Sequence, residues 1–175
     1  MRAAIFRLLP LLACSALVSA DANSVISAFN QVNADLVKLD IDVNATPSGI
    51  VGIGPALQVS VDSVTVDNDL IATQAQVTRS SVFTASESNN IVNAIQQVAG
   101  TANTTIADVI KQYNTFGGLA PVVLAALYQL RQDQNNLGVS LYSKLDSSQL
   151  NRGIQILVGL NQAFGRAITA YGGTP

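Results

Sequence analysis

The segment from Thr84 to Phe116 is the longest stretch of the chain that keeps one regular period. Apolar or small side chains recur in it in steps of three and four residues, at Ile91, Ile95, Val98, Ala102, Ile106, Val109, Tyr113 and Phe116. This spacing places them on one face of an α-helix. The segment opens with Thr84-Ala-Ser-Glu87, which matches a helix capping box, and it stops at a pair of glycines. The sequence therefore predicts one long helix here.

Four other segments also carry a helical stripe. The first begins near Ser24, its predicted N-cap, and runs to about Val43, and two later helices begin near Pro121 and Asp146. The stripes of these three are Val25, Phe29, Val32, Leu36, Leu39 and Val43; Val123, Leu127, Leu130, Leu137, Leu141 and Leu145; and Leu150, Ile154, Leu157, Phe164, Ile168 and Tyr171. Gln134 interrupts the second of them and Asn161 the third.

The segment from Pro55 to about Thr78 gives two conflicting signals. Its β-branched residues alternate with polar ones in places, which is typical of a strand. A helical stripe also fits, with Asn68 filling one place among Leu57, Val61, Val64, Ile71 and Ala75. More than twenty residues without a turn signal favour the helix. Five helices with short links predict an all-α antiparallel bundle.

Residues 1 to 20 are predicted to be a cleaved secretory signal peptide. Two arginines, Arg2 and Arg7, precede an apolar run from Leu8 to Val18, and Val18-Ser19-Ala20 is a suitable cleavage site. The run is too short to cross a bilayer. The alternatives to a cleaved signal peptide are an uncleaved membrane anchor and a lipoprotein signal in which Cys14 is lipidated. Cleavage leaves residues 21–175 as a single domain without cysteine or a transmembrane segment, which has to be stabilised by packing alone.

The composition excludes most catalytic chemistry. The chain has no histidine, so neither a Ser-His-Asp triad nor the usual zinc sites can form. Its single glutamate, Glu87, is explained by the capping box. Aspartates two residues apart, such as Asp40/Asp42 and Asp67/Asp69, do not share a helix face, and a solvated surface is the expectation for them. We expect no enzyme activity, no metal and no cofactor.

The charge pattern and two short motifs bear on partners and modification. A net charge of -2 without a basic stripe argues against a nucleic-acid partner. Asn44-Ala-Thr46 and Asn103-Thr-Thr105 match the N-glycosylation sequon, and in a eukaryotic secretory pathway both could carry glycans. Chance occurrence is the alternative, because Pro47 follows the first sequon and the second lies within a predicted helix.

Three segments of the mature chain carry a resemblance to a known family. They are Val32 to Asp40, Ile106 to Lys111 and Leu127 to Gln134, in a chain rich in Ala, Val, Leu, Ser, Thr, Asn and Gln. The pattern resembles the fungal hydrophobic surface binding protein A and cell-wall galactomannoprotein family. This resemblance implies a helical, secreted or wall-associated protein without catalytic activity. Members adsorb to hydrophobic surfaces, where they help recruit secreted esterases, or hold fatty acids such as arachidonic acid inside the bundle.

Three functions therefore remain open: a carrier of fatty acid or other lipid, a protein that adsorbs to hydrophobic surfaces, and a structural wall mannoprotein without a ligand. For the carrier, the candidate apolar lining is Phe29, Leu36, Val61, Val64, Ile95, Val98, Val109, Leu127 and Phe164. The candidate polar contacts to a lipid head group are Asn68, Tyr113, Gln134 and Asn161. The alternative is a solid core, in which these amides pair with each other and fix the helix register.

Overall fold

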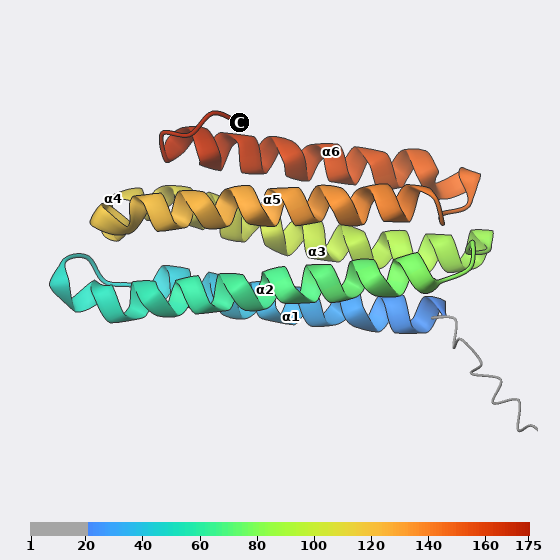
Figure 1. The fold of residues 1–175 in the computed structure, drawn as a ribbon, viewed down its shortest axis with the longest axis horizontal. Coiled ribbons are helices and arrows are strands. Elements are labelled where there is room, and N and C mark those ends of the chain that lie inside the picture. The colour runs from blue at the N-terminus through green and yellow to red at the C-terminus, as the bar shows by residue number, and fades with distance from the viewer. Residues whose placement is uncertain (1–20) are drawn as a thin grey trace, which may run out of the picture.

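The structure, a computed structural model, describes residues 21–175 (Figure 1). The predicted signal peptide and Cys14 lie outside the described residues. The long helices are α1 (Ala22–Ala45), α2 (Ile53–Arg79), α3 (Ala85–Lys111), α5 (Ala120–Tyr142) and α6 (Ser147–Ala170). The short ones are η1 (Ile50–Gly52), α4 (Tyr113–Phe116) and η2 (Gly117–Leu119). The described chain contains no strand, and its consecutive long helices run in opposite directions (Figure 1), which confirms the all-α antiparallel bundle.

The five long helices close into a ring. Helix α1 packs against α2 and α3, α2 packs against α5, α5 against α6, and α6 against α3. Three of these neighbouring pairs, α1/α3, α2/α5 and α3/α6, run parallel, because an even number of chain reversals separates their members (Figure 1). Each helix therefore has two neighbours, and its apolar stripe faces the axis of the ring. None of the described helices runs along the axis, which is filled by side chains.

The helix starts follow from capping side chains. At α3 the predicted capping box is present, with the Glu87 carboxylate accepting from the Thr84 amide and the Thr84 hydroxyl accepting from the Glu87 amide. At α6 the Asp146 carboxylate accepts from the Ser148 amide at 2.9 Å. The predicted cap of α1 was wrong: Asp21 is the N-cap, and its carboxylate accepts from the Ser24 amide at 2.7 Å.

Helix α3 is shorter than its predicted length. It ends at Lys111, and the chain continues after Gln112 as the short helix α4, which ends at Phe116. The backbone of Gln112 leaves helical geometry, and this change lets Phe116 turn into the core, where it is buried. The apolar stripes predicted for α1, α3, α5 and α6 do face the interior, since nearly all their members are buried or half-buried.

Helix α2 presents a different face to the core from the predicted one. The predicted stripe lies on the outside, with Leu57 52%, Val61 58%, Val64 58% and Ile71 46% exposed and with Asn68 and Ala75 exposed as well. The buried face is Ala56, Val59, Asp62, Ser63, Val66, Leu70, Thr73 and Val77. This face includes polar side chains because most of their polar atoms find partners there, Asp62 Oδ2 being an exception. For example, the Thr73 hydroxyl donates to the Asp69 carbonyl of its own helix at 2.6 Å.

One end of the bundle is tied together by hydrogen bonds between two loops. The Phe83 amide donates to the Lys144 carbonyl, and the Asp146 amide donates to the Ser88 hydroxyl, each at 2.8 Å. The Lys144 ammonium donates to the Ser80 carbonyl at the end of α2. These bonds hold the α2–α3 loop against the α5–α6 loop, on the right in Figure 1.

At the other end, the link between α1 and α2 depends on a glycine. A Cβ atom at Gly52 would lie 1.7 Å from the Pro47 carbonyl oxygen. We therefore expect Gly52→Ala to lower the free energy of unfolding by about 1–3 kcal/mol, because the link has to shift. A Cβ at Gly100, in the middle of α3, would meet nothing within 4 Å. Gly100→Ala should instead raise the free energy by about 0.5–1 kcal/mol. Urea denaturation of both variants tests the pair, and a Gly52→Ala protein as stable as the parent would contradict it.

Candidate functional site

The interior of the ring is apolar and includes most of the predicted lining. Seven of the nine predicted side chains are buried there: Phe29, Leu36, Ile95, Val98, Val109, Leu127 and Phe164. They come from α1, α3, α5 and α6. The other two, Val61 and Val64, lie on the exposed face of α2, so their predicted place inside the bundle is wrong. The reason is that α2 has two apolar stripes, and the one with Val59 and Val66 meets the neighbouring helices.

A groove runs along the seam between α2 and α5. Its volume is about 350 Å³, which lies at the lower end of the range typical of small-molecule sites. Its lining is mainly small and apolar: Ser60, Ser63, Val64 and Asp67 from α2, and Val122, Ala125, Ala126, Gln129 and Leu130 from α5. Val64 therefore stands at the rim of this groove rather than inside the bundle.

A small cavity lies directly beneath the groove. Its volume is about 40 Å³, and it reaches the interior side chains Leu39, Val109 and Leu127. The groove and the cavity share four lining residues, Ser60, Ser63, Ala126 and Leu130. Three of these four side chains are small, so the wall between the outside and the interior is thin along this seam. The cavity has room for about one or two waters, but not for a long ligand, unless α2 and α5 move apart.

Gln134 is a buried amide without a partner. It lies on α5 one turn after Leu130 and is 6% exposed. Neither its Oε1 nor its Nε2 atom has a hydrogen-bond partner. A buried polar group left in this state costs about 1–3 kcal/mol. The sequence predicted Gln134 as a polar contact to a ligand, and the structure places it in the apolar face of α5 with both polar atoms free.

The other three predicted polar contacts are not gathered around Gln134. Asn161 is joined to α5, because its Oδ1 accepts from the Arg131 Nε at 2.8 Å and its Nδ2 donates to Asn135. This agrees with the alternative that amides fix the helix register. Asn68 is exposed on the outer face of α2. Tyr113 is also exposed, and its ring lies edge-on to Tyr171 with centroids 5.1 Å apart.

Carboxyl groups meet across the seams of α2. The expectation of a solvated surface is wrong for Asp40 and Asp67, which each have a buried carboxyl oxygen. Asp62 is 3% exposed, Asp133 is buried, and buried Oδ1 atoms of Asp40 and Asp67 lack a hydrogen-bond partner. Asp67 faces Asp133 across the α2/α5 seam. Because Asp67 and Asp133 lie on helices far apart in the sequence, spacing alone does not reveal this contact.

The α1/α2 seam carries two more carboxyl pairs. Asp35 faces Asp69, and Asp42 faces Asp62. The two members on each helix are seven residues apart, which places them on one face, and antiparallel packing sets them opposite each other. This shared spacing is a signal that sequence reasoning could have used.

Burial and the facing carboxyl groups change how two of these aspartates titrate. Burial, together with Asp133, raises the pKa of Asp67 from 3.8 to about 6. Burial, together with Asp35, raises the pKa of Asp69 from 3.8 to about 6. In both cases burial is the larger cause, since a carboxylate is stabilised less inside the protein than in water. Asp67 and Asp69 therefore keep their protons at a pH at which an exposed aspartate is ionised.

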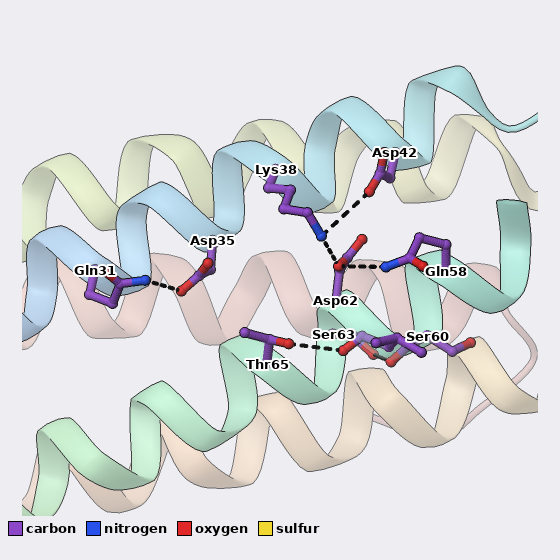
Figure 2. Close-up of polar contacts among 10 residues, drawn as sticks. Gln31, Asp35, Lys38, Asp42, Gln58, Ser60, Asp62, Ser63 and Thr65 are labelled. Carbon is purple, nitrogen blue, oxygen red and sulfur yellow. Dashed lines mark hydrogen bonds and ion pairs between the residues drawn. The ribbon is translucent and has the colours of Figure 1, made fainter.

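The Asp42/Asp62 pair differs because a cation bridges it (Figure 2). The Lys38 ammonium of α1 forms an ion pair with Asp62 of α2 and lies 3.9 Å from the Asp42 carboxylate. Gln58 also donates to Asp62 at 3.0 Å. Burial by itself would raise the pKa of Asp62, but hydrogen bonds with Asp42, Lys38 and Gln58 outweigh it and lower that pKa. This part of the α1/α2 seam is therefore closed by opposite charges.

The fold and the site define a class of protein: a closed ring of helices around an apolar axis, with a ligand-sized groove along one seam and no group of three His, Cys, Asp or Glu among residues 21–175 that could hold a metal. None of the described helices is long and apolar enough to span a membrane. The model of the hydrophobic surface binding protein A family matches residues 22–143. The chain belongs to this family, which confirms the resemblance seen in the sequence.

Solved structures share the fold at low sequence identity. AFMP4P in complex with palmitic acid matches with a TM-score of 0.82 and 18% identity, over 86% of this chain and 99% of that one. Ligand binding domain 1 of the Penicillium marneffei MP1 protein, complexed with arachidonic acids, has a TM-score of 0.79 at 18% identity, with the same two coverages. Domain 2 of that protein, complexed with multiple arachidonic acids, has a TM-score of 0.79 at 14% identity and covers 90% of this chain and 99% of its own. Among proteins with curated functions, none matches the chain.

Gln134 and Asn161 lie on facing helices, and their replacement by leucine should change the free energy of unfolding in opposite directions. Gln134→Leu removes a buried amide that has no partner, so we expect it to raise the free energy of unfolding of the ligand-free protein by about 1–3 kcal/mol. Asn161→Leu removes the partner of Arg131 and Asn135, and should lower that free energy by about 1–3 kcal/mol. Denaturant titration measures both. Destabilisation by Gln134→Leu would show that its amide is satisfied in solution.

Proposed function

We propose that this protein is a non-enzymatic lipid carrier that holds a fatty acyl chain between its helices. The carrying observation is the thin α2/α5 seam, where a groove and a cavity share their lining directly above an apolar interior. The fatty acids bound to AFMP4P and to the MP1 domains support the choice of ligand class. The seven buried residues of the predicted lining would contact the acyl chain. They are Phe29, Leu36, Ile95, Val98, Val109, Leu127 and Phe164.

The energetics of burial favour such a ligand. A chain of about sixteen carbons, buried at about 0.8 kcal/mol per CH₂, gains roughly 12 kcal/mol before the costs of association and ordering. Several kcal/mol of cost still leave micromolar or tighter binding without a charged clamp. The described interior offers no such clamp. Separation of α2 from α5 belongs to these costs, because the cavity is too small for the chain when the seam is closed.

Gln134 is our proposed contact for the polar end of the ligand. Its amide can donate through Nε2 and accept through Oε1, so it can bind a carboxylic acid in either protonation state. It is the one candidate among the four that is both buried and without a partner. Asn68, Tyr113 and Asn161 were predicted for the same role, and their exposure or existing contacts favour Gln134 over them.

The outer face of α2 favours a second candidate function, adsorption to hydrophobic material. Leu57, Val61, Val64 and Ile71 form an exposed apolar stripe along it. Next to the start of α2, three more side chains are at least half exposed: Ile50, Val51 and Ile53. An apolar stripe that the fold does not bury marks a site of interaction. The family description, hydrophobic surface binding, agrees with this use of α2.

We further propose that the protein acts outside the cell, secreted or held in a cell wall. The predicted signal peptide supports this location. The asparagines of both sequons are exposed, Asn44 near the end of α1 and Asn103 within α3, so a glycan there would not enter the core, although the sequon threonines Thr46 and Thr105 are buried. Recruitment of secreted esterases is a partner proposal that the family resemblance alone supports. A wall mannoprotein without a ligand remains the alternative if no lipid binds.

Blocking the seam tests the carrier. Ala126 lines both the groove and the cavity, so Ala126→Trp fills the proposed entrance. We expect the dissociation constant for palmitic acid to rise by at least about tenfold, because the indole occupies space that the chain needs. Isothermal titration calorimetry of the delipidated protein measures it, with circular dichroism as a check of folding. Val158→Trp, on the exposed face of α6, is the control and should bind like the parent.

Adsorption is tested separately on the outside of α2. The double variant Val61→Lys and Ile71→Lys places two charges on the exposed stripe, and we expect much weaker adsorption to polystyrene beads, with palmitic acid binding retained. Its matched control, Val139→Lys and Val158→Lys, charges exposed valines on α5 and α6. Equal adsorption by both variants would show that the α2 face is not the adsorbing surface.

A further inference from the structure

Access to the interior requires α2 to separate from a neighbour, and its two seams differ. On the α1 side, Lys38 bridges Asp42 and Asp62, and Gln58 adds a hydrogen bond (Figure 2). On the α5 side, the Gln74 amide approaches the Ser140 hydroxyl at a long 3.4 Å, and the Lys144 ammonium donates to the Ser80 carbonyl only at the tied end, away from the groove. The Lys38–Asp62 ion pair holds α2 to α1 and does nothing to hold it to α5. The α5 side is therefore the weaker seam beside the cavity. A larger groove of about 560 Å³ lies on the α1 side, but only the groove on the α5 side shares lining residues with the cavity that reaches the interior.

Two acids face each other across the α2/α5 seam, and none of the described residues that line the groove is basic. Asp67 is part of this lining, and one of its oxygens is buried without a partner. Asp133 is buried on α5, and its carboxylate accepts from the Gln129 amide at 2.6 Å. A proton on Asp67 gives the pair one donor, so that Asp67 can donate to Asp133. Without this proton, two like charges face each other in a partly buried seam, which is strongly unfavourable.

We propose that the Asp67–Asp133 pair is a proton-dependent latch on the groove, closed while Asp67 is protonated and released when Asp67 ionises. This inference rests on the proposed lipid function, because it assigns the control of access to that same site. The ligand would be retained in acidic surroundings and exchanged near neutral pH. The charged groups on the other seam of α2 are Asp35, Asp69, Asp42, Asp62 and Lys38. The Lys38–Asp62 ion pair holds α1 to α2 from acidic to neutral pH, because the pKa of Asp62 is lowered.

The sign and size of the effect follow from linkage. The pKa of Asp67 is raised in the closed state from 3.8 to about 6, so closure takes up a proton. The stabilisation is complete below about pH 4 and is lost as the pH rises through about 6. If Asp67 has an ordinary pKa in the open state, the opening equilibrium increases roughly tenfold between pH 5 and pH 7.

Ligand release measures this equilibrium. Parinaryl alcohol is a suitable probe because it is fluorescent and has no ionisable group, so only the protein titrates. The purified protein is loaded with it and mixed with phosphatidylcholine vesicles at pH 5 and at pH 7. We expect release to be roughly tenfold faster at pH 7. Asp133→Asn should remove most of this difference, because the amide that it introduces can donate to Asp67 at either pH. Asp67→Asn should also remove most of the pH difference in the release rate, and it replaces Asp133→Asn as the test if that variant does not fold.

Asp69→Asn is the matched control for position. Asp69 lies two residues from Asp67 on the same helix and has a pKa raised to about 6 as well, but it faces Asp35 on the α1 side. This variant should keep the pH dependence of release. If it abolishes the dependence while Asp133→Asn keeps it, the latch is not on the α2/α5 seam. A release rate that is equal at pH 5 and pH 7 in the parent overturns the latch and leaves the carrier function standing.

A readout without ligand separates the two proposals. Carbon-13 NMR of the aspartate carboxyls in the ligand-free protein should show Asp67 titrating near pH 6 in the parent and at least about one pH unit lower in Asp133→Asn. An Asp67 that titrates with an ordinary aspartate pKa in the parent overturns the latch. Failure of the probe to bind at any pH refutes the carrier function, and the carboxyl titration then still decides whether the pair holds a proton.

Discussion

The structure depends on a geometric constraint: five helices have to bury an apolar face against one axis that no helix occupies. Each long helix packs extensively against two other long helices, so its stripe packs partly against them and partly against the side chains on the axis. Phe29, Phe164 and Val109 fill part of this space from three different helices. Such a core has no central backbone to preserve. In the proposed carrier, an acyl chain that enters between α2 and α5 would therefore have to displace only side chains from the axis.

Helix α2 is the member of the ring that satisfies this constraint least well. Its buried face carries Asp62, Ser63 and Thr73 among its apolar side chains, while an apolar stripe interrupted only by Asn68 remains outside. The buried groups are tolerated because Lys38 neutralises Asp62 and because the hydroxyls bond to carbonyls of their own helix. These contacts stabilise the polar atoms but add little apolar burial. The groove, the thin wall and the carboxyl pairs all lie along this helix.

The sequence predicted most of the fold because four helices each have one apolar stripe and a clear start signal. Thr84 and Glu87 formed the expected capping box, and the segment around Ile95 and Val98 faces the core. The prediction from sequence failed for α2, because this helix has two apolar stripes and the more apolar of the two faces outward. The choice depends on tertiary partners: Asp62 can be buried only because Lys38, 24 residues earlier, reaches it.

The candidate site was predictable only in part, for the same reason. Gln134 stood out as a polar interruption of an apolar stripe, and it is buried and unpaired. Asn161 gave the same signal in the sequence, yet it pairs with Asn135, which the spacing along one helix cannot reveal. The Asp67–Asp133 contact joins α2 to α5 and has no local signature at all. Pairings between helices decide these roles, and single-helix patterns do not contain them.

The hydrogen bonds between the two loops at one end of the bundle determine how α2 can move. Lys144 and Phe83 hold the chain beside the last turn of α2, whereas its first turn follows the short link after Pro47. A rigid helix of 27 residues is roughly 40 Å long, so it acts as a lever with its pivot at the tied end. A tilt of about a tenth of a radian leaves Ser80 in place and carries Ile53 through roughly 4 Å. Three of the four α2 residues that line the groove, Ser60, Ser63 and Val64, lie in the half of α2 far from the pivot, where a small rotation produces the wider opening.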